Sequence, residues 1–124
     1  MTSGDPVAVR GSLEADPSAE AQPPAIVVID DDRAMRLSCQ KILTKSGFRV
    51  QTFETGSAGL EAVTALKPAM AVVDLKMPGI SGMEVIARLH EIDPHSVIVV
   101  ITGYATIDTA VEAMKSGAFD FVPK

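Results

Sequence analysis

The chain of 124 residues contains a single cysteine, Cys39, and only two histidines, His90 and His95. One cysteine cannot form a disulfide within the chain, and these three residues lack the spacing of a zinc site. No apolar run approaches the roughly 18 to 20 residues of a membrane span, and the N-terminus lacks the basic and then apolar pattern of a signal peptide. The sequence therefore excludes disulfide-rich, zinc-binding and membrane-embedded classes and favours a cytoplasmic protein.

An excess of basic residues is also absent. The chain has 16 acidic and 11 basic residues and a net charge of −5 at pH 7. A mildly acidic chain without a basic stripe is a poor candidate for binding nucleic acid. The length and the 47% hydrophobic content suit one domain with a substantial core. We expect one soluble domain that by itself binds neither nucleic acid nor membrane.

Residues 1–24 differ in composition from the rest of the chain. They are rich in proline, glycine, alanine and acidic residues, and Val7, Val9 and Leu13 are the only sizeable apolar residues between Met1 and Ile26. Such a segment buries too little apolar surface to offset the entropy lost on ordering. We predict a disordered leader over residues 1–24 and a folded domain over residues 25–124.

Short apolar runs bounded by breakers predict the strands. Residues 25–29, 71–73, 96–101 and 119–123 are typical of buried strands, whereas residues 48–53 alternate apolar and polar side chains, as at a sheet edge. Five strands separated by helical patterns predict a doubly wound parallel α/β sheet with right-handed crossovers.

Helical periodicity fills the four intervals between these strands. Asp32 is suited to cap the first helix, and Ser81 with Glu84 forms a capping-box pattern at the third. The residues expected to face the core are Met35, Cys39, Ile42 and Leu43 in the first helix, Leu60, Val63 and Leu66 in the second, Met83, Ile86, Leu89 and His90 in the third, and Ile107, Ala110, Val111 and Met114 in the fourth.

Acidic residues follow two of the buried strands, namely Asp30 and Asp31 after the first and Asp74 after the third. Ligands of doubly wound sheets bind beyond the carboxyl ends of the strands, where the strand order reverses. In the order 2-1-3-4-5, the flavodoxin-like order, the first and third strands flank that point. The three carboxylates would then converge, with Thr102 and Lys124 ending the next two strands on the same rim.

Converging carboxylates repel one another unless a cation or a lysine intervenes. Mg²⁺ fits best, because it takes oxygen ligands from one or two carboxylates and shares its shell with a phosphoryl oxygen. Taken alone, Lys124 suits a solvated surface charge and Thr102 a turn residue. Together with Asp74 and a metal ion, they supply what is needed to transfer a phosphoryl group onto an aspartate.

Four motifs carry a family resemblance: V-I-D-D-D at 28–32, V-V-D-L-K-M-P-G-I-S-G at 72–82, V-V-I-T-G-Y-A-T at 99–106 and G-A-F-D-F-V-P-K at 117–124. Over residues 25–124 the sequence resembles the receiver domains of two-component response regulators, most of all those of nitrogen-regulator-type transcriptional activators. The resemblance implies a phosphorylatable switch that regulates an output domain or partner. Such a protein catalyses only its own phosphotransfer and dephosphorylation.

The resemblance also implies individual roles. Asp74 would be the phosphoacceptor, loaded from a phosphohistidine of a sensor histidine kinase. Asp30 and Asp31, not Asp32, would form the acidic pair, and Mg²⁺ would bind to Asp31, to Asp74 and to the backbone carbonyl of Lys76. The remaining roles would be a switch hydroxyl for Thr102, a phosphate-binding ammonium for Lys124, an aromatic switch for Phe121 and tuning of the dephosphorylation rate for Lys76 and Tyr104.

The family continues past this lysine with a proline, a loop and a fifth helix on the sheet face that the first helix also covers. The sequence ends at Lys124. We therefore expect a receiver truncated before its fifth helix and without its output domain. Apolar surface around the first, third and fifth strands should be exposed, which predicts instability, self-association or a homodimer.

Three other functions are compatible with this topology. A flavodoxin-like cofactor binder would need phosphate-binding groups in the first loop, where Asp30 to Asp32 repel phosphate. A phosphatase that works through an aspartyl-phosphate would need an acid two residues after the nucleophile, where Lys76 stands. A phosphorylation-independent interaction module would not respond to beryllofluoride, a phosphate mimic, with Mg²⁺.

Overall fold

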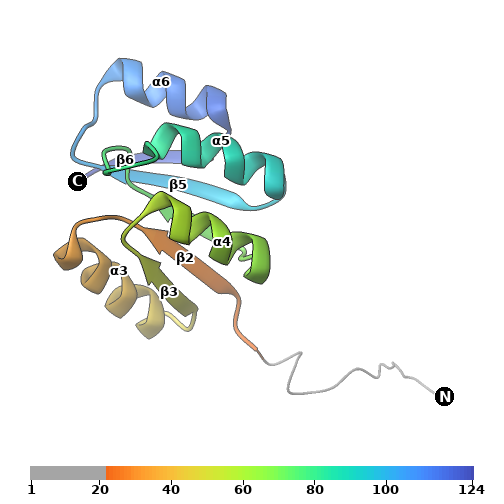
Figure 1. The fold of residues 1–124 in the computed structure, drawn as a ribbon. Coiled ribbons are helices and arrows are strands. Elements are labelled where there is room, and N and C mark those ends of the chain that lie inside the picture. The colour runs from red at the N-terminus through yellow and green to blue at the C-terminus, as the bar shows by residue number, and fades with distance from the viewer. Residues whose placement is uncertain (1–21) are drawn as a thin grey trace.

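The computed structural model describes residues 22–124, so most of the predicted leader lies outside the described residues. Five strands and four helices alternate along this part of the chain (Figure 1), as predicted. The strands are β2 (Ala25–Ile29), β3 (Arg49–Phe53), β4 (Met70–Val73), β5 (Val97–Thr102) and β6 (Asp120–Pro123). The helices are α3 (Arg33–Lys45), α4 (Gly56–Leu66), α5 (Gly82–Ile92) and α6 (Ile107–Ser116). Within the described residues, none of these helices combines the length and the apolar character needed to cross a bilayer.

All neighbouring strands are parallel, and their order is β3-β2-β4-β5-β6. This is the predicted order 2-1-3-4-5. Ile29 at the end of β2 lies opposite Val73 at the end of β4, and Val73 lies opposite Val100 of β5. Asp30 and Asp74 therefore follow adjacent strands at the same level of the sheet.

One face of the sheet is closed by α4, α5 and α6, which follow one another along the sheet in Figure 1. The main core lies between these helices and the strands. Its members with at most 1% exposure are Val27, Ile29, Val63, Ala71, Val73, Val85, Ile86, Leu89, Ile98, Val100 and Ala113. We call this side the closed face.

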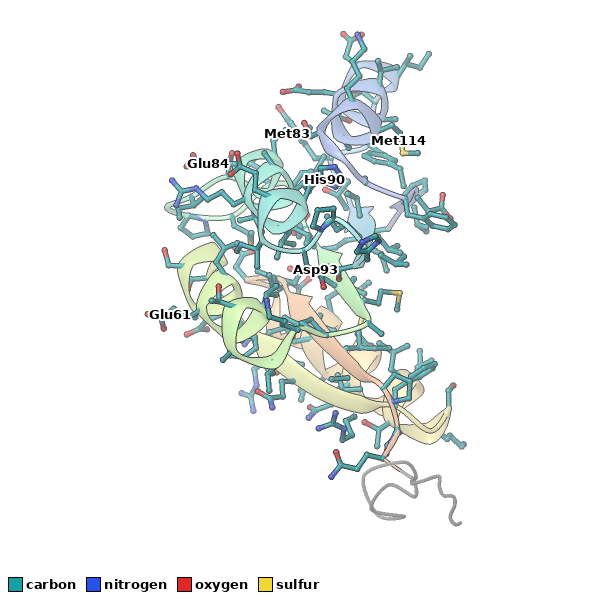
Figure 2. All side chains as sticks on the ribbon, turned by 90° about the vertical axis from the view of Figure 1, so that its right-hand side faces the viewer. Glu61, Met83, Glu84, His90, Asp93 and Met114 are labelled. Atoms are coloured by element: carbon teal, nitrogen blue, oxygen red, sulfur yellow. The ribbon has the colours of Figure 1, made fainter. Side chains whose placement is uncertain are left out.

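Two helices on the closed face differ from expectation. In α5, Val85 is buried, whereas His90 is exposed and lies between α5 and the segment after α6 (Figure 2), against Gly117. In α6, the predicted apolar stripe faces solvent: Ile107 is 83% exposed and Met114 is 47% exposed. The small side chain of Ala113 is buried instead. The reason is that a short side chain lets α6 approach its neighbours closely, so that the larger residues remain outside.

Of the helices in the described residues 22–124, the other face carries α3 alone, and we call it the open face. Its core is small, with Ile26, Val28 and Val72 buried and no residue of α3 itself fully buried. An apolar groove of about 280 Å³ runs beside α3, and it is lined by Met35, Ser38, Cys39, Ile42, Leu43, Met70, Val72, Val99 and Ile101.

The expected exposure of apolar surface is thus only partly right. Exposure affects β6, where Val122 is 39% exposed, but not β2, whose outward residues Ile26 and Val28 are covered by α3, nor Val72 of β4, which is also buried. Ile42, expected to face the core, is 63% exposed at the edge of the groove. The first helix therefore covers β2 and the adjoining parts of β3 and β4, and β6 at the far edge of the sheet stays exposed.

Candidate functional site

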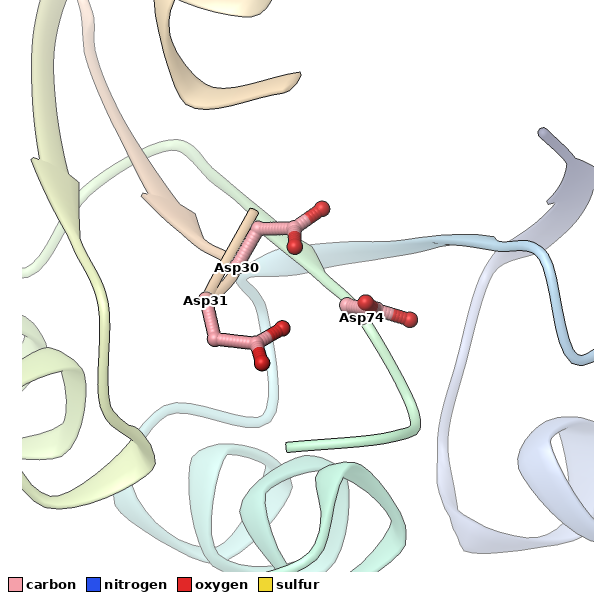
Figure 3. Close-up of side chains that lie close together, drawn as sticks. All are labelled: Asp30, Asp31 and Asp74. Atoms are coloured by element: carbon pink, nitrogen blue, oxygen red, sulfur yellow. The ribbon is translucent and has the colours of Figure 1, made fainter. Parts of the chain in front are cut away.

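The carboxylates of Asp30, Asp31 and Asp74 lie together at the carboxyl end of the sheet (Figure 3), with one oxygen of each within 4.8 Å of the others. The parallel register of β2 and β4 brings them there. Asp30 and Asp74 are 3% and 5% exposed, whereas Asp31 is open to solvent. Asp32, the third acid of the first loop, is instead the N-cap of α3 and accepts hydrogen bonds from the N–H groups of Ala34 and Met35.

Lys124 reaches the cluster from the end of β6. Its Nζ lies 3.1 Å from Oδ2 of Asp30 and 3.2 Å from Oδ2 of Asp74. The lysine backbone is held by its N–H, which donates to the carbonyl of Thr102 at 2.8 Å. One ammonium thus serves two buried carboxylates while a third carboxylate lies beside them, so the site carries excess negative charge.

Burial and the neighbouring charges both shift the pKa values of Asp30 and Lys124. Burial raises the pKa of Asp30, and the charge of Asp74 raises it further, against hydrogen bonds from the Asp32 N–H and from Lys124 that lower it. Partial burial acts to lower the pKa of Lys124, but hydrogen bonds to Asp30 and Asp74 and their charges outweigh it, so that the pKa is raised. Lys124 therefore stays protonated at neutral pH, and ionised Asp30 is disfavoured unless more positive charge is supplied.

Thr102 ends β5 beside the cluster and is fully buried. Its Oγ1 accepts a hydrogen bond from the N–H of Tyr104 at 3.0 Å, and the carbonyl of Tyr104 accepts one from Oγ1 of Thr109 at 3.1 Å. Thr109 and Thr106 form a reciprocal capping box at the start of α6. A continuous set of hydrogen bonds therefore links Thr102 to the first turn of α6. The sequence signal for this link is a pair of threonines three residues apart at the start of the predicted helix, and this pair is not among the sequence-based predictions.

The loop after Asp74 is fixed by a close approach of α5. A Cβ atom at Gly82 would clash with the carbonyl oxygen of Asp74, so only glycine fits there. The N–H of Gly82 donates to the carbonyl of Leu75 at 2.9 Å. The N–H of Lys76 lies 3.4 Å from Oδ1 of Asp74. The backbone around Asp74 is thereby packed directly against the start of a helix.

A cavity of about 370 Å³ opens above these groups and is lined by Asp31, Asp32, Asp74, Lys76, Thr102, Gly103, Tyr104 and Lys124. At its edge the Nζ of Lys76 lies 5.1 Å from the centre of the Tyr104 ring, a cation–π distance. Phe121 does not line this cavity. It is half-buried on the closed face and pairs with Val100, two residues before Thr102.

The cluster offers only oxygen ligands, two buried and one exposed. Such a set suits a hard divalent cation, because carboxylate oxygens are the ligands that Mg²⁺ and Ca²⁺ prefer. A cation here would also supply the positive charge that Lys124 alone does not provide. The residues present therefore fit a divalent metal ion.

Comparison with known proteins agrees with this geometry. The family model of the response regulator receiver domain matches residues 26–124. The chain belongs to the response regulator receiver family. The match begins at the second residue of β2 and extends to Lys124, so it covers all the other strands and helices that the structure describes.

This receiver domain is similar to regulators of transcription. It is 41% identical over 100 residues to the photosynthetic apparatus regulatory protein RegA of Rhodobacter capsulatus, a match that covers 81% of this chain and 54% of that protein. It is 33% identical over 97 residues to the DNA-binding transcriptional regulator NtrC of Klebsiella pneumoniae, covering 78% of this chain and 21% of NtrC. The chain thus spans about half of the first relative and about a fifth of the second. The predicted likeness to nitrogen-regulator receivers is confirmed.

Solved receiver structures share the fold. A response regulator from Burkholderia pseudomallei, with a phosphorylated aspartic acid, a calcium ion and citrate, is 34% identical, with a TM-score of 0.78 over 82% of this chain and 59% of that one. A receiver domain from Methanospirillum hungatei is 28% identical, with a TM-score of 0.80 over 83% of this chain and 82% of that one.

Proposed function

We propose that this receiver domain accepts a phosphoryl group on Asp74 from a phosphohistidine of a sensor histidine kinase, in a reaction that requires Mg²⁺. The phosphorylated domain then regulates an output domain or partner that acts in transcription. The observation that carries this proposal is the position of Asp74, buried at the end of a central strand with Lys124 at 3.2 Å and two further acids beside it. The expected location is the cytoplasm, where a kinase has access to ATP.

Asp74 is the nucleophile in this proposal. One of its carboxylate oxygens forms a bond to phosphorus while the bond between phosphorus and the histidine nitrogen breaks, and the electron pair of that bond returns to the imidazole. The remaining groups position and neutralise charge, which is most of the catalysis in phosphoryl transfer. Asp31, Asp74 and the backbone carbonyl of Lys76 would hold Mg²⁺, with Asp30 adjacent. When bound, the metal offsets the negative charge that carboxylates and phosphoryl oxygens bring together.

Lys124 is already placed for an exchange of partners. Its ammonium lies between Asp30 and Asp74 in the unphosphorylated structure. After transfer, the same ammonium would pair with a phosphoryl oxygen on Asp74, since phosphate carries more charge than the carboxylate it replaces. Lys124 thus stabilises the product without a large movement.

Thr102 would convert the new charge into a structural change. Phosphorylation adds about −1.5 to −2 charges and strong acceptor oxygens. The hydroxyl of Thr102 would turn to donate to them and strain its hydrogen bond with Tyr104, which leads through Thr109 to α6. Phe121 would then rotate inward into the space that Thr102 leaves. A coupling of about 1–3 kcal/mol is typical of such systems.

Lys76 and Tyr104 line the cavity above Asp74 and contact each other by their cation–π pair. A water molecule that hydrolyses the phosphoaspartate must enter through this region. We propose that these two side chains set the dephosphorylation rate through access of water, so that removing either one changes the lifetime of the phosphorylated state.

Labelling with acetyl phosphate and Mg²⁺ tests the proposed phosphoacceptor. The wild-type chain should gain one phosphoryl group by mass spectrometry, and Asp74→Asn should gain none. Asp108→Asn is the matched control because Asp108 is exposed in the first turn of α6 and lies outside both the cavity and the carboxylate cluster, so it should be labelled normally. Full labelling of Asp74→Asn would refute the assignment.

Beryllofluoride with Mg²⁺ tests the switch separately from the chemistry. Amide resonances of Tyr104 and Thr109 should shift on addition, because they lie on the hydrogen-bonded link between Thr102 and α6. If labelling occurs while these resonances stay unchanged, the domain accepts phosphate without switching, as an interaction module would.

A further inference from the structure

Arg36 lies behind the acidic loop, on the second turn of α3. Its Nη1 donates to the backbone carbonyl of Asp30 at 2.8 Å, and its Nη2 lies 3.6 Å from Oε2 of Glu54 after β3. The Arg36 side chain is 15% exposed, whereas that of Glu54 is 73% exposed. The guanidinium is therefore held beside the loop by its hydrogen bond to Asp30, and the ion pair with Glu54 is a weaker support.

The carbonyl that Arg36 binds belongs to the peptide group joining Asp30 to Asp31. Because a peptide group is rigid and planar, fixing the direction of its carbonyl also fixes where the backbone of Asp31 begins. Other groups of Asp30 are held as well, since its N–H donates to Phe53 at 3.0 Å and its Oδ1 accepts from Asp32 at 2.9 Å.

Asp31 differs from its neighbours in this respect. Its side chain is exposed, and within residues 22–124 no hydrogen bond restrains its carboxylate. The direction of this carboxylate therefore depends on the backbone that carries it. Arg36 is the side chain that donates to that backbone at the peptide preceding Asp31.

We infer that Arg36 is a positioning residue that orients the Asp30–Asp31 peptide so that Asp31 presents its carboxylate to a divalent cation. This inference rests on the proposed function, because the cation is the one that phosphoryl transfer onto Asp74 would require. Arg36 itself contacts neither the metal nor the phosphoryl group. It acts through the backbone of Asp30.

The charge of Arg36 and its positioning role predict opposite changes in Mg²⁺ affinity when Arg36 is removed. A positive charge near a cation site repels the cation, so removing it should tighten Mg²⁺ binding if charge alone matters. If Arg36 orients Asp31, removing it should weaken binding, because outer-shell partners that orient ligands typically contribute about 10–100-fold in affinity. The sign of the change therefore separates the two roles.

Calorimetric titration with magnesium chloride provides the test. Arg36→Met should weaken Mg²⁺ binding about tenfold, within the range for residues that orient metal ligands. Arg33→Met removes the same charge from an exposed position on the same helix, and should leave affinity unchanged or slightly tighter. Unchanged or tighter binding by Arg36→Met would overturn the inference.

Arg36→Lys keeps the charge but cannot reproduce the planar fork that reaches Asp30 and Glu54 together. It should weaken Mg²⁺ binding several-fold, and wild-type affinity in this variant would overturn the inference even if Arg36→Met failed to fold. Circular dichroism checks the fold of each variant.

The Asp31→Asn variant separates failure of the positioning role of Arg36 from failure of the proposed function. One possible result is that the wild type binds Mg²⁺, that Asp31→Asn loses Mg²⁺ binding, and that the Arg36 variants keep the wild-type affinity. In that case the positioning role of Arg36 fails and the proposed function stands. If the wild type does not bind Mg²⁺, both fail.

Discussion

The apolar core under α4 and α5 and the acidic cluster at the ends of β2 and β4 lie in one sheet but affect folding in opposite ways. Val73, which is fully buried, stabilises the fold by leaving water. Asp74, the next residue, is almost as buried but brings a charge beside the charge of Asp30. Burial in the sheet interior therefore stabilises the folded state. The clustered carboxylates at the carboxyl end of the sheet destabilise it, and they stay in place because the core is stable enough to offset this cost.

The largest expected effect comes from the closed face. Leu89→Ala should lower the free energy of unfolding by about 2–5 kcal/mol, because it empties a position that is 1% exposed in the main core. Urea denaturation followed by circular dichroism measures this change. Leu37→Ala on α3 is the control, since Leu37 is 52% exposed and should change stability by less than about 0.5 kcal/mol. Equal losses in both variants would mean that the core is not concentrated on the closed face.

At the acidic cluster, a substitution should raise the free energy of unfolding instead of lowering it. Asp30→Asn should raise the free energy of unfolding by about 1 kcal/mol at pH 7 without divalent cations, because it removes one of two buried charges that share Lys124. The same variant should bind Mg²⁺ more weakly. Asp32→Asn is the isosteric control, because asparagine caps a helix as well as aspartate does. A destabilised Asp30→Asn variant would show that the carboxylate contributes to folding like a core residue.

The pH dependence sharpens this contrast. The pKa of Asp30 is raised in the folded state above its ordinary value of 3.8, so the folded chain keeps a proton at pH values where the unfolded chain has lost it. The cost of ionised Asp30 is full at neutral pH and disappears as the pH falls through the raised pKa toward 3.8. The stability advantage of Asp30→Asn, up to about 1 kcal/mol, should therefore shrink on acidification. Urea titrations of the wild type and of Asp30→Asn, from neutral to mildly acidic pH, measure this difference in unfolding free energy. A difference that grows on acidification would contradict the raised pKa of Asp30.

The smallest effect on stability is expected on the open face. Ile42→Gln should change the free energy of unfolding by less than about 0.5 kcal/mol, because Ile42 is 63% exposed at the edge of the apolar groove. It should, however, reduce self-association in sedimentation equilibrium, since the groove is the apolar surface that a second copy would cover. Leu37→Gln, the same kind of change at an exposed position of α3 that does not line the groove, is the control. Unchanged association in Ile42→Gln would remove the groove as its cause.

Much of the fold and the site could be predicted from the sequence, because both depend on where strands end. Continuous apolar runs indicate buried parallel strands, and an acid directly after such a run, as at Asp74, has few structural reasons to be there. The order of the strands then brings Asp30, Thr102 and Lys124 to the same rim. No pairwise contact had to be known for this step.

The parts that could not be predicted depend on tertiary distances. Helical periodicity does not tell which of two apolar stripes turns inward, and in α6 the inward one contains Ala113 rather than Met114. Nor does the sequence show that Gly82 touches the carbonyl of Asp74, or that Arg36 reaches the backbone of Asp30. These contacts are set by how closely a helix approaches the sheet, which local patterns do not record.

The hydrogen bond between Tyr104 and Thr102 has one more consequence. In the resting molecule the hydroxyl that should respond to phosphate already has a partner, so an incoming phosphoryl group competes with that partner for the position of the side chain. The balance between the two partners sets what fraction of the phosphorylated molecules is in the signalling conformation at any moment. A change in the loop around Tyr104 would then alter the strength of the response while leaving the rate of phosphorylation unchanged. Two receivers with the same phosphoacceptor site would therefore differ in how strongly phosphorylation activates them.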